Sequence, residues 1–221
     1  MVEVSTSILS ADKENSLGVF YNLEVAKTNY FHIDVMDGKF VENNTIELMQ
    51  EYVGQIKQIS NIPLDIHLMV KDIKIFVDSY IAYEPNTITF HLEACENEKQ
   101  AKEIIRYIHD NHIKVGMAIK PNTSTQELYK YLPYLNSVLI MTVEPGKGGQ
   151  KLIPSTIEKV EKIKEYIENN NIDIDIEVDG GVNLENVEKL KEAGANIIVA
   201  GTAIVNSKDY TKTIEKIKFD R

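Results

Sequence analysis

The sequence predicts a closed (β/α)8 barrel, an α/β fold, on three observations. Short apolar runs alternate with longer amphipathic, charged segments along almost the whole chain, and eight such pairs can be assigned. The length of 221 residues is large for one ordinary domain but normal for a single barrel of this type. No linker, low-complexity tract or shift in composition divides the chain, so we expect residues 1–221 to form one domain. The alternative is an open doubly wound sheet, which would need fewer strands or a reversal of the strand order.

The first half of the chain is expected to supply four strand–helix pairs. Its strands are rich in β-branched and aromatic residues and cover residues 2–7, 30–34, 64–68 and 87–91. Asp12 can cap the first helix, in which apolar residues recur at helical spacing from Leu17 to Ala26. Beyond a long polar loop at 38–44, the other helices are expected at about 45–59, 72–83 and 98–111.

The second half repeats the alternation. Its strands are expected at 114–119, 137–142, 174–179 and 196–200. Pro154 opens a strongly periodic helix that runs to the turn at 169–171, and Asn183 can cap a helix that ends at Ala193. Two further helices are expected near 125–131 and at about 209–218.

Composition limits the class of protein before any motif is considered. The formal net charge is −10 and the pI is about 5.1, so no basic excess is available to neutralise the phosphates of a nucleic acid. The single cysteine, Cys95, excludes an internal disulfide and fits a reducing compartment. The N-terminus lacks the features of a signal peptide, and no uncharged apolar run approaches the roughly 20 residues that span a membrane. We therefore expect a soluble, cytoplasmic protein that binds neither nucleic acid nor membrane.

Side chains that can bind metals lie at the ends of three expected strands. His32 and Asp34 share one face of a strand because side chains alternate, His67 lies near the end of the next, and Asp179 closes a third. The C-terminal ends of all the parallel strands converge at one mouth of a barrel. Each of these residues, taken alone, would more often be a structural residue of a half-buried strand than a metal ligand. Together, two imidazoles and two carboxylates predict a site for one divalent cation, with zinc, iron(II), cobalt and manganese all suitable.

Glycine-containing turns follow the last three expected strands and indicate a second feature of the site. These turns are Gly146-Lys147-Gly148-Gly149, Gly180-Gly181 and Gly201-Thr202. Barrels often bind a phosphate at this position with backbone N–H groups, and the first turn could supply a flexible flap. Glycines also end strands for conformational reasons, but their clustering after consecutive strands favours a phosphate site.

Seven stretches together resemble the ribulose-phosphate 3-epimerase family, and they occur in the family's order across almost the whole chain. They read STSILSAD at 5–12, HIDVMDG at 32–38, DIHLMV at 65–70, FHLEA at 90–94, MTVEPG at 141–146, GGQ at 148–150 and EVDGGV at 177–182. The resemblance implies an isomerase that acts on a small sugar phosphate and forms a homo-oligomer. It implies that His32, Asp34, His67 and Asp179 bind the metal, that Asp34 and Asp179 are the catalytic acid–base pair, and that the glycine turns hold the phosphate. Ser7 and His67 would contact the substrate.

The implied chemistry agrees with the residues. Epimerisation next to a ketone removes a proton from one face of a carbon and delivers another to the opposite face, which two carboxylates on separate strands can do without a redox cofactor. The metal would polarise the neighbouring carbonyl as a Lewis acid. Met36, Met69 and Met141 offer an apolar wall that excludes water, although ordinary core filling explains them equally well.

Three rival functions are considered. A hexulose-6-phosphate 3-epimerase, acting for example on allulose 6-phosphate, would use the same ligands and acid–base pair. A related barrel decarboxylase or aldolase would resemble the pattern Asp-x-Lys-x-x-Asp, but His67 stands at the position of that lysine. A non-catalytic sugar-phosphate binder would be expected to have lost a ligand, and none is missing. Gly148 and Gly181 favour the pentulose enzyme, since related hexulose enzymes tend to differ at these turns, so we expect interconversion of D-ribulose 5-phosphate and D-xylulose 5-phosphate in the pentose phosphate pathway. The sequence departs from the family pattern at Lys39, Glu42 and Lys147, which leaves the packing of the lid loops open.

Overall fold

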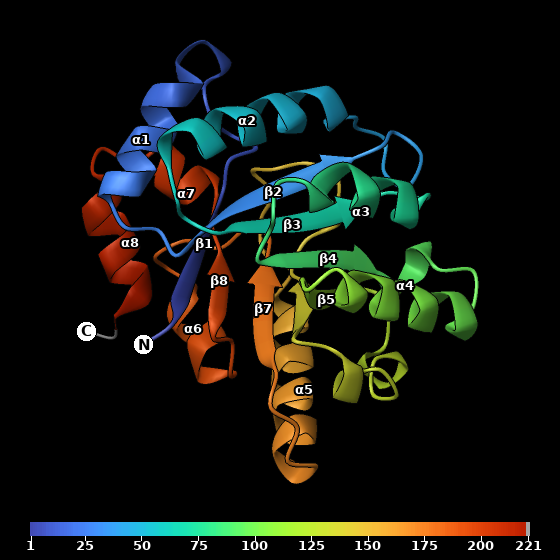
Figure 1. Cartoon of the computed structure of the whole chain (residues 1–221). Helices are drawn as coiled ribbons and strands as arrows, with labels where there is room; N and C mark the ends of the chain where they lie inside the picture. Colours follow the sequence, from blue (N-terminus) through green and yellow to red (C-terminus); the bar gives the residue numbers. More distant parts are fainter. Residues whose placement is uncertain (220–221) are drawn as a thin grey trace.

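A ring of parallel strands forms the centre of the molecule in a computed structural model that describes residues 1–219 (Figure 1). Within these residues the eight strands are β1 (Glu3–Ser7), β2 (Tyr30–Met36), β3 (Leu64–Met69), β4 (Thr87–His91), β5 (Lys114–Ile119), β6 (Ser137–Met141), β7 (Asp175–Asp179) and β8 (Ile197–Val199). Each strand pairs with its neighbours in sequence, and β8 pairs with β1 through Val199 and Ser5. This last pairing closes the sheet, which confirms the predicted (β/α)8 barrel and excludes the open sheet.

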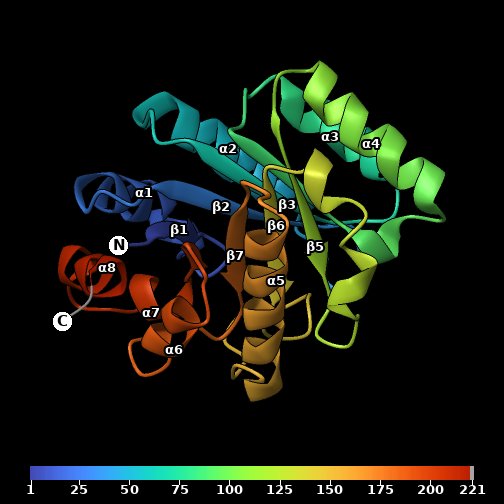
Figure 2. The same ribbon diagram turned by 90° about the horizontal axis from the view of Figure 1, so that it is seen from below.

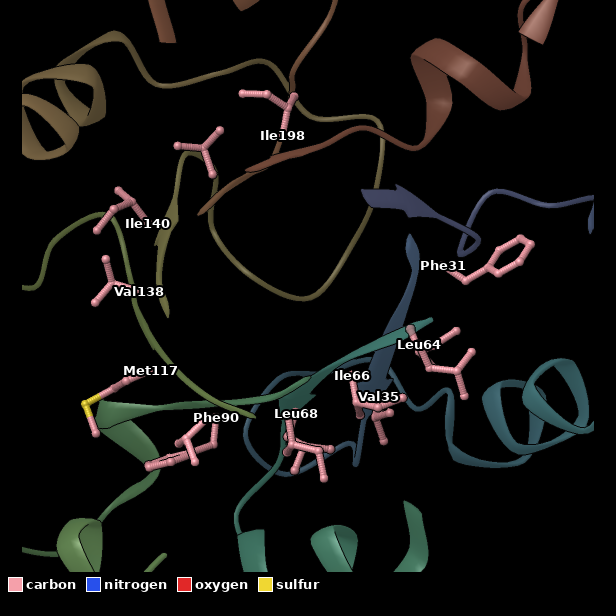
Figure 3. Close-up of a cluster of buried hydrophobic side chains, with 14 of the residues drawn as sticks. Phe31, Val35, Leu64, Ile66, Leu68, Phe90, Met117, Val138, Ile140 and Ile198 are labelled. Atoms are coloured by element: carbon pink, nitrogen blue, oxygen red, sulfur yellow. The ribbon is translucent and has the colours of Figure 1, made fainter. Parts of the chain in front are cut away.

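Helices surround this ring on the outside (Figure 2). They are α1 (Ser16–Val25), α2 (Ile46–Ile59), α3 (Ile73–Ile81), α4 (Glu98–Asp110), α5 (Ile157–Asn169), α6 (Val187–Glu192), α7 (Thr202–Val205) and α8 (Tyr210–Lys218). Their apolar faces pack against strand residues such as Phe31, Leu64 and Met117, whose side chains point outward from the ring (Figure 3). The main core is therefore the layer between strands and helices, and the inner face of the barrel is free to carry polar side chains. No helix within residues 1–219 is both long and apolar enough to cross a membrane.

Strand register determines which polar side chains meet inside the barrel. On β2 and β3, His32 pairs with Asp65 and Asp34 pairs with His67, so an imidazole and a carboxylate alternate on both strands. On the opposite side, Met141 of β6 pairs with Asp179 of β7. Strand β2 continues to Met36, two residues further than predicted, which places that side chain on the same inner face.

Three local predictions about helices are wrong. The expected helix near 125–131 is replaced by two 3-10 turns, Thr125–Glu127 and Leu132–Tyr134, because the segment before Pro133 is too short for a stable α-helix and proline disfavours helical geometry in the residue before it. Asp12 caps a 3-10 turn, and α1 begins only at Ser16.

The third error concerns Asn183, which does not cap an α-helix. Its side chain accepts a hydrogen bond from the backbone N–H of Glu185 at 2.8 Å, which forms a turn, and α6 begins only at Val187. The short helix α7 was not predicted at all.

Candidate active site

The four predicted metal ligands converge at the mouth of the barrel. His32 and Asp34 come from β2, His67 from β3 and Asp179 from the last position of β7. Both histidines are fully buried, and the side chains of Asp34 and Asp179 are 7% and 16% exposed. The alternation of side chains on β2 and β3 is what brings three of them to the same inner face.

The separations between donor atoms fit one tetrahedrally bound ion. Asp34 Oδ1 lies 3.5 Å from His32 Nε2 and 3.3 Å from His67 Nδ1. Asp179 Oδ2 lies 3.9 Å from His32 Nε2 and 3.6 Å from His67 Nδ1. Donors bound about 2.0–2.2 Å from a common tetrahedral centre are about 3.3–3.6 Å apart, so small side-chain adjustments would suffice.

Two buried nitrogen atoms give independent support for a cation at this position. His32 Nε2 and His67 Nδ1 have no hydrogen-bond partner within residues 1–219, although both are buried among carboxylates. An unpartnered polar atom in the interior is costly, so each such atom requires an explanation. Both nitrogens face the same two aspartates, and a metal ion would satisfy all four side chains.

The two aspartates differ in their electrostatic environment. Burial alone would raise the pKa of Asp34, but the electrostatic attraction of the neighbouring His32 and His67 imidazoles outweighs it and holds this pKa well below its usual range. Burial and the nearby Asp34 carboxylate raise the pKa of Asp179 to about 6. Pairs of titratable groups with pKa values pushed apart are typical of acid–base sites.

A buried network holds His32 from behind. Asp65 accepts a hydrogen bond from His32 Nδ1 at 2.7 Å and a second from the Ser5 hydroxyl at 2.8 Å. Glu177 Oε1 lies 3.6 Å from the same nitrogen of His32. Sequence reasoning did not single out Glu177, although it lies two residues before Asp179 and therefore faces the same way on β7.

A cavity of about 270 Å³ opens above the four predicted ligands. Among its lining residues are Ser7, Asp34, Met36, Met69, Met141 and Asp179. Ser7 donates a hydrogen bond from its hydroxyl to Asp34 Oδ2 at 2.7 Å, which links β1 to the ligand cluster. His32 and His67 lie beneath the cavity and are not among its lining residues, so a substrate contact by His67 stays a prediction.

The predicted glycine turns contribute to the wall of the same cavity. All of them line it, together with Lys147 and Thr202. Gly180 and Gly181 have positive φ angles of 120° and 67°, and a Cβ atom on either would lie within 2.4 Å of Val143 or of the Leu152 backbone. These two glycines are therefore required by local packing, whatever they bind.

The flap between β6 and α5 is tied to its surroundings by side-chain amides. Gln150 donates from Nε2 to the carbonyl oxygens of Glu144 and Lys147, at 2.7 and 2.9 Å. Asn43, in the loop after β2, donates to the carbonyl oxygen of Gly146 at 2.6 Å. The loops in which the sequence departs from the family pattern therefore contact each other across the mouth.

Fold and site together define a (β/α)8-barrel enzyme in which two imidazoles and two carboxylates at the strand ends can hold one cation. A family model described as "Ribulose-phosphate 3 epimerase family" matches residues 3–205. The chain belongs to this family and is an isomerase of the epimerase class.

Relatives and solved structures place the chain within this family and fold. Ribulose-phosphate 3-epimerase of Bacillus subtilis is 36% identical over 219 residues, which cover 99% of both chains. The enzyme of the same name from Escherichia coli K12 is 35% identical over 219 residues, or 97% of this chain and 94% of the relative. Among solved structures, 3-hexulose-6-phosphate synthase matches with a TM-score of 0.70 at 13% identity and 98% coverage of both chains. KGPDC from Streptococcus mutans gives a TM-score of 0.70 at 10% identity, covering 99% of this chain and 96% of that one. At such low identity the two structures support the fold alone.

Proposed function

We propose that this chain is a metal-dependent 3-epimerase that interconverts D-ribulose 5-phosphate and D-xylulose 5-phosphate in the pentose phosphate pathway. The observation that carries the proposal is the pairing of Asp34 and Asp179 around two unpartnered, buried histidine nitrogens beneath a cavity. Membership of the epimerase family supports the reaction type.

In this mechanism the two aspartates act from different strands on the same carbon of the substrate. One carboxylate removes the proton from C3, the electron pair of the broken C–H bond moves into the carbonyl group to give an enediolate, and the other aspartate donates a proton to the opposite face. The two roles exchange when the reaction runs backward.

His32, His67, Asp34 and Asp179 would hold a divalent ion. When bound, that ion supplies Lewis-acid polarisation of the substrate carbonyl. Zinc is our first choice because two imidazoles and two carboxylates in near-tetrahedral arrangement suit it, and iron(II), cobalt and manganese fit the same donors.

The remaining cavity residues bind and shield the substrate. Ser7 orients Asp34 through its hydrogen bond, and Met36, Met69 and Met141 keep water from the reacting carbon. Backbone N–H groups of the glycine turns, with Lys147 as a nearby cation, would bind the phosphate. We also propose a homo-oligomer, as the family resemblance implies, and a cytoplasmic location, since the single cysteine fits a reducing compartment.

The test is a coupled assay on metal-reconstituted protein that compares ribulose 5-phosphate with allulose 6-phosphate. We expect a higher kcat/KM for the pentulose phosphate. A preference for allulose 6-phosphate would replace the proposed substrate by a hexulose and leave the two-aspartate mechanism in place. Full activity in protein shown by elemental analysis to contain no metal would overturn the metal requirement.

A further inference from the structure

A second histidine lies directly behind the proposed metal ligand His67. His91, the last residue of β4, places its Nε2 atom 2.9 Å from Nε2 of His67. The two rings stack with centroids 5.0 Å apart and an interplanar angle of 29°, and both side chains are fully buried. His67 thus contacts His91 through Nε2, whereas Nδ1 of His67 faces Asp34 and Asp179.

The chain of contacts continues from His91 to a carboxylate. His91 Nδ1 lies 3.2 Å from Oε2 of Glu93, which belongs to the 3-10 turn after β4. The other oxygen, Oε1, accepts hydrogen bonds from the backbone N–H of Lys120, at 2.7 Å, and from the hydroxyl of Thr123. Three interactions, one with the end of β4 and two with the loop after β5, therefore fix the position of Glu93.

These contacts allow one arrangement of protons when a cation is bound. A metal on Nδ1 of His67 uses that lone pair, so the ring proton must be on Nε2. His67 then donates to His91 Nε2, which must carry a lone pair, and the proton of His91 must be on Nδ1. Nδ1 finds the acceptor it needs in Glu93.

We propose that His91 and Glu93 are positioning residues of the metal site, which fix His67 in the ring orientation and tautomer that presents Nδ1 to the ion. Metal-binding histidines commonly donate their second N–H to a carboxylate, and His32 does so directly through Asp65. For His67 the carboxylate acts through a second imidazole. This inference rests on the metal site of the proposed function.

The position of His91 argues against a direct role in substrate binding. It does not line the cavity, and its ring is covered by Phe40, whose centroid is 4.9 Å away. Lys120 Nζ lies 4.1 Å from the centroid of the Phe40 ring on the loop side. In the hydrogen-bonded relay His67–His91–Glu93, the two imidazoles are thus buried beneath Phe40 of the loop after β2, where water cannot compete easily for their hydrogen bonds.

The first experiment measures zinc affinity by chelator competition in wild type, His91→Leu, His91→Gln and Glu93→Gln. Removal of such a supporting partner typically weakens metal binding by about 10- to 100-fold, and we expect this for His91→Leu and a smaller loss for Glu93→Gln. His91→Gln, whose amide oxygen can accept from His67, should recover most of the affinity. His109→Gln is the matched control, because His109 lies on the exposed face of α4. The His109→Gln protein should bind zinc with wild-type affinity.

The second experiment reads the protons directly in the zinc-loaded wild-type protein, so it does not depend on the folding of any variant. Nitrogen-15 NMR of the imidazoles should find the proton on Nε2 of His67 and on Nδ1 of His91. A proton on Nε2 of His91, or wild-type zinc affinity in folded His91→Leu, would overturn the relay alone. If the wild-type protein binds no zinc, cobalt, iron(II) or manganese, the proposed metal site fails and the relay fails with it.

Discussion

Asp34 and Asp179 occupy similar positions at strand ends, yet their surroundings make them different. Asp34 is buried and accepts a hydrogen bond from Ser7, and its pKa is held well below the usual range. Asp179 is more exposed, and its pKa is raised to about 6. This asymmetry is a property of individual residues, and it can be tested one residue at a time.

We expect Asp34→Asn and Asp179→Asn each to lose epimerisation by at least roughly 10²- to 10⁴-fold, since asparagine keeps the shape but cannot transfer the proton. One variant should still exchange the C3 proton of one epimer with solvent, and the other variant that of the opposite epimer. NMR in D2O can follow this exchange once the metal content of each variant has been measured. Exchange of the same epimer in both metal-replete variants would contradict the two-face mechanism.

At the scale of the elements, the flap after β6 offers a clean test of the phosphate site. Gly148 has a negative φ angle, and an added Cβ would make only an ordinary contact with Ser10 Oγ at 3.5 Å. Gly201 is less suitable, because a Cβ there would lie 3.1 Å from Ser7 Cβ and so disturb the partner of Asp34.

We therefore expect Gly148→Ala to raise the KM for the phosphorylated substrate by roughly 10-fold. The methyl group of the alanine would occupy cavity space near the proposed phosphate and displace it from a backbone N–H group. Loss of such a charge-assisted hydrogen bond costs about 1.5 kcal/mol or more. Zinc affinity should not change. Gly54→Ala is the matched control, since nothing lies within 4 Å of a Cβ at that position on α2. Equal KM values for the two variants would remove the flap from the phosphate site.

Glu93 connects the turn after β4 to the loop after β5, and this connection should depend on pH. Burial alone raises its pKa, but hydrogen bonds from His91, Thr123 and Lys120 outweigh it and lower the pKa from 4.5 to about 2. A carboxyl group whose pKa is lower in the folded state stabilises the protein above its unfolded pKa, and this stabilisation disappears as the pH falls toward the folded value.

Wild type should therefore exceed Glu93→Gln in free energy of unfolding by up to about 3 kcal/mol at pH 7, and the difference should shrink between pH 5 and pH 2. Urea unfolding at several pH values measures it. Glu98→Gln serves as a control, because Glu98 forms ion pairs with Lys102 and Lys130 at an exposed position, where they contribute little. A pH-independent difference for Glu93→Gln would argue against an ionised Glu93 in the native protein.

On the scale of the whole molecule, a bound ion would connect strands that are distant in the sequence. The four proposed ligands come from β2, β3 and β7, so binding would require the closed barrel and should stabilise it against global unfolding.

Zinc at about 1,000 times its Kd should raise the unfolding free energy by about 4 kcal/mol and the Tm by roughly 8–16 °C. Differential scanning calorimetry with and without a chelator measures this shift. Asp179→Ala, which removes one ligand, should show a much smaller shift at the same zinc concentration. An equal shift in that variant would mean that zinc binds elsewhere.

Local sequence pattern was sufficient to predict most of the fold and the side chains that meet at the mouth of the barrel. Alternation with a period of two assigned His32, Asp34 and Met36 to one face, and the structure places all three on the inner face of β2. Glycine after strands located the turns around the cavity. These features are encoded locally, because backbone geometry alone decides which way a side chain points.

Other features follow only from the tertiary structure. Strand periodicity cannot give the register that brings Asp179 within 3.9 Å of His32, nor reveal that His67 uses Nε2 for His91 and leaves Nδ1 free for an ion. The environments that separate the pKa values of Asp34 and Asp179 also arise from burial and from neighbours on other strands. Sequence determined the residue types and the faces on which they lie, while closure of the barrel between β8 and β1 decided their distances, since those depend on contacts between residues far apart in the chain.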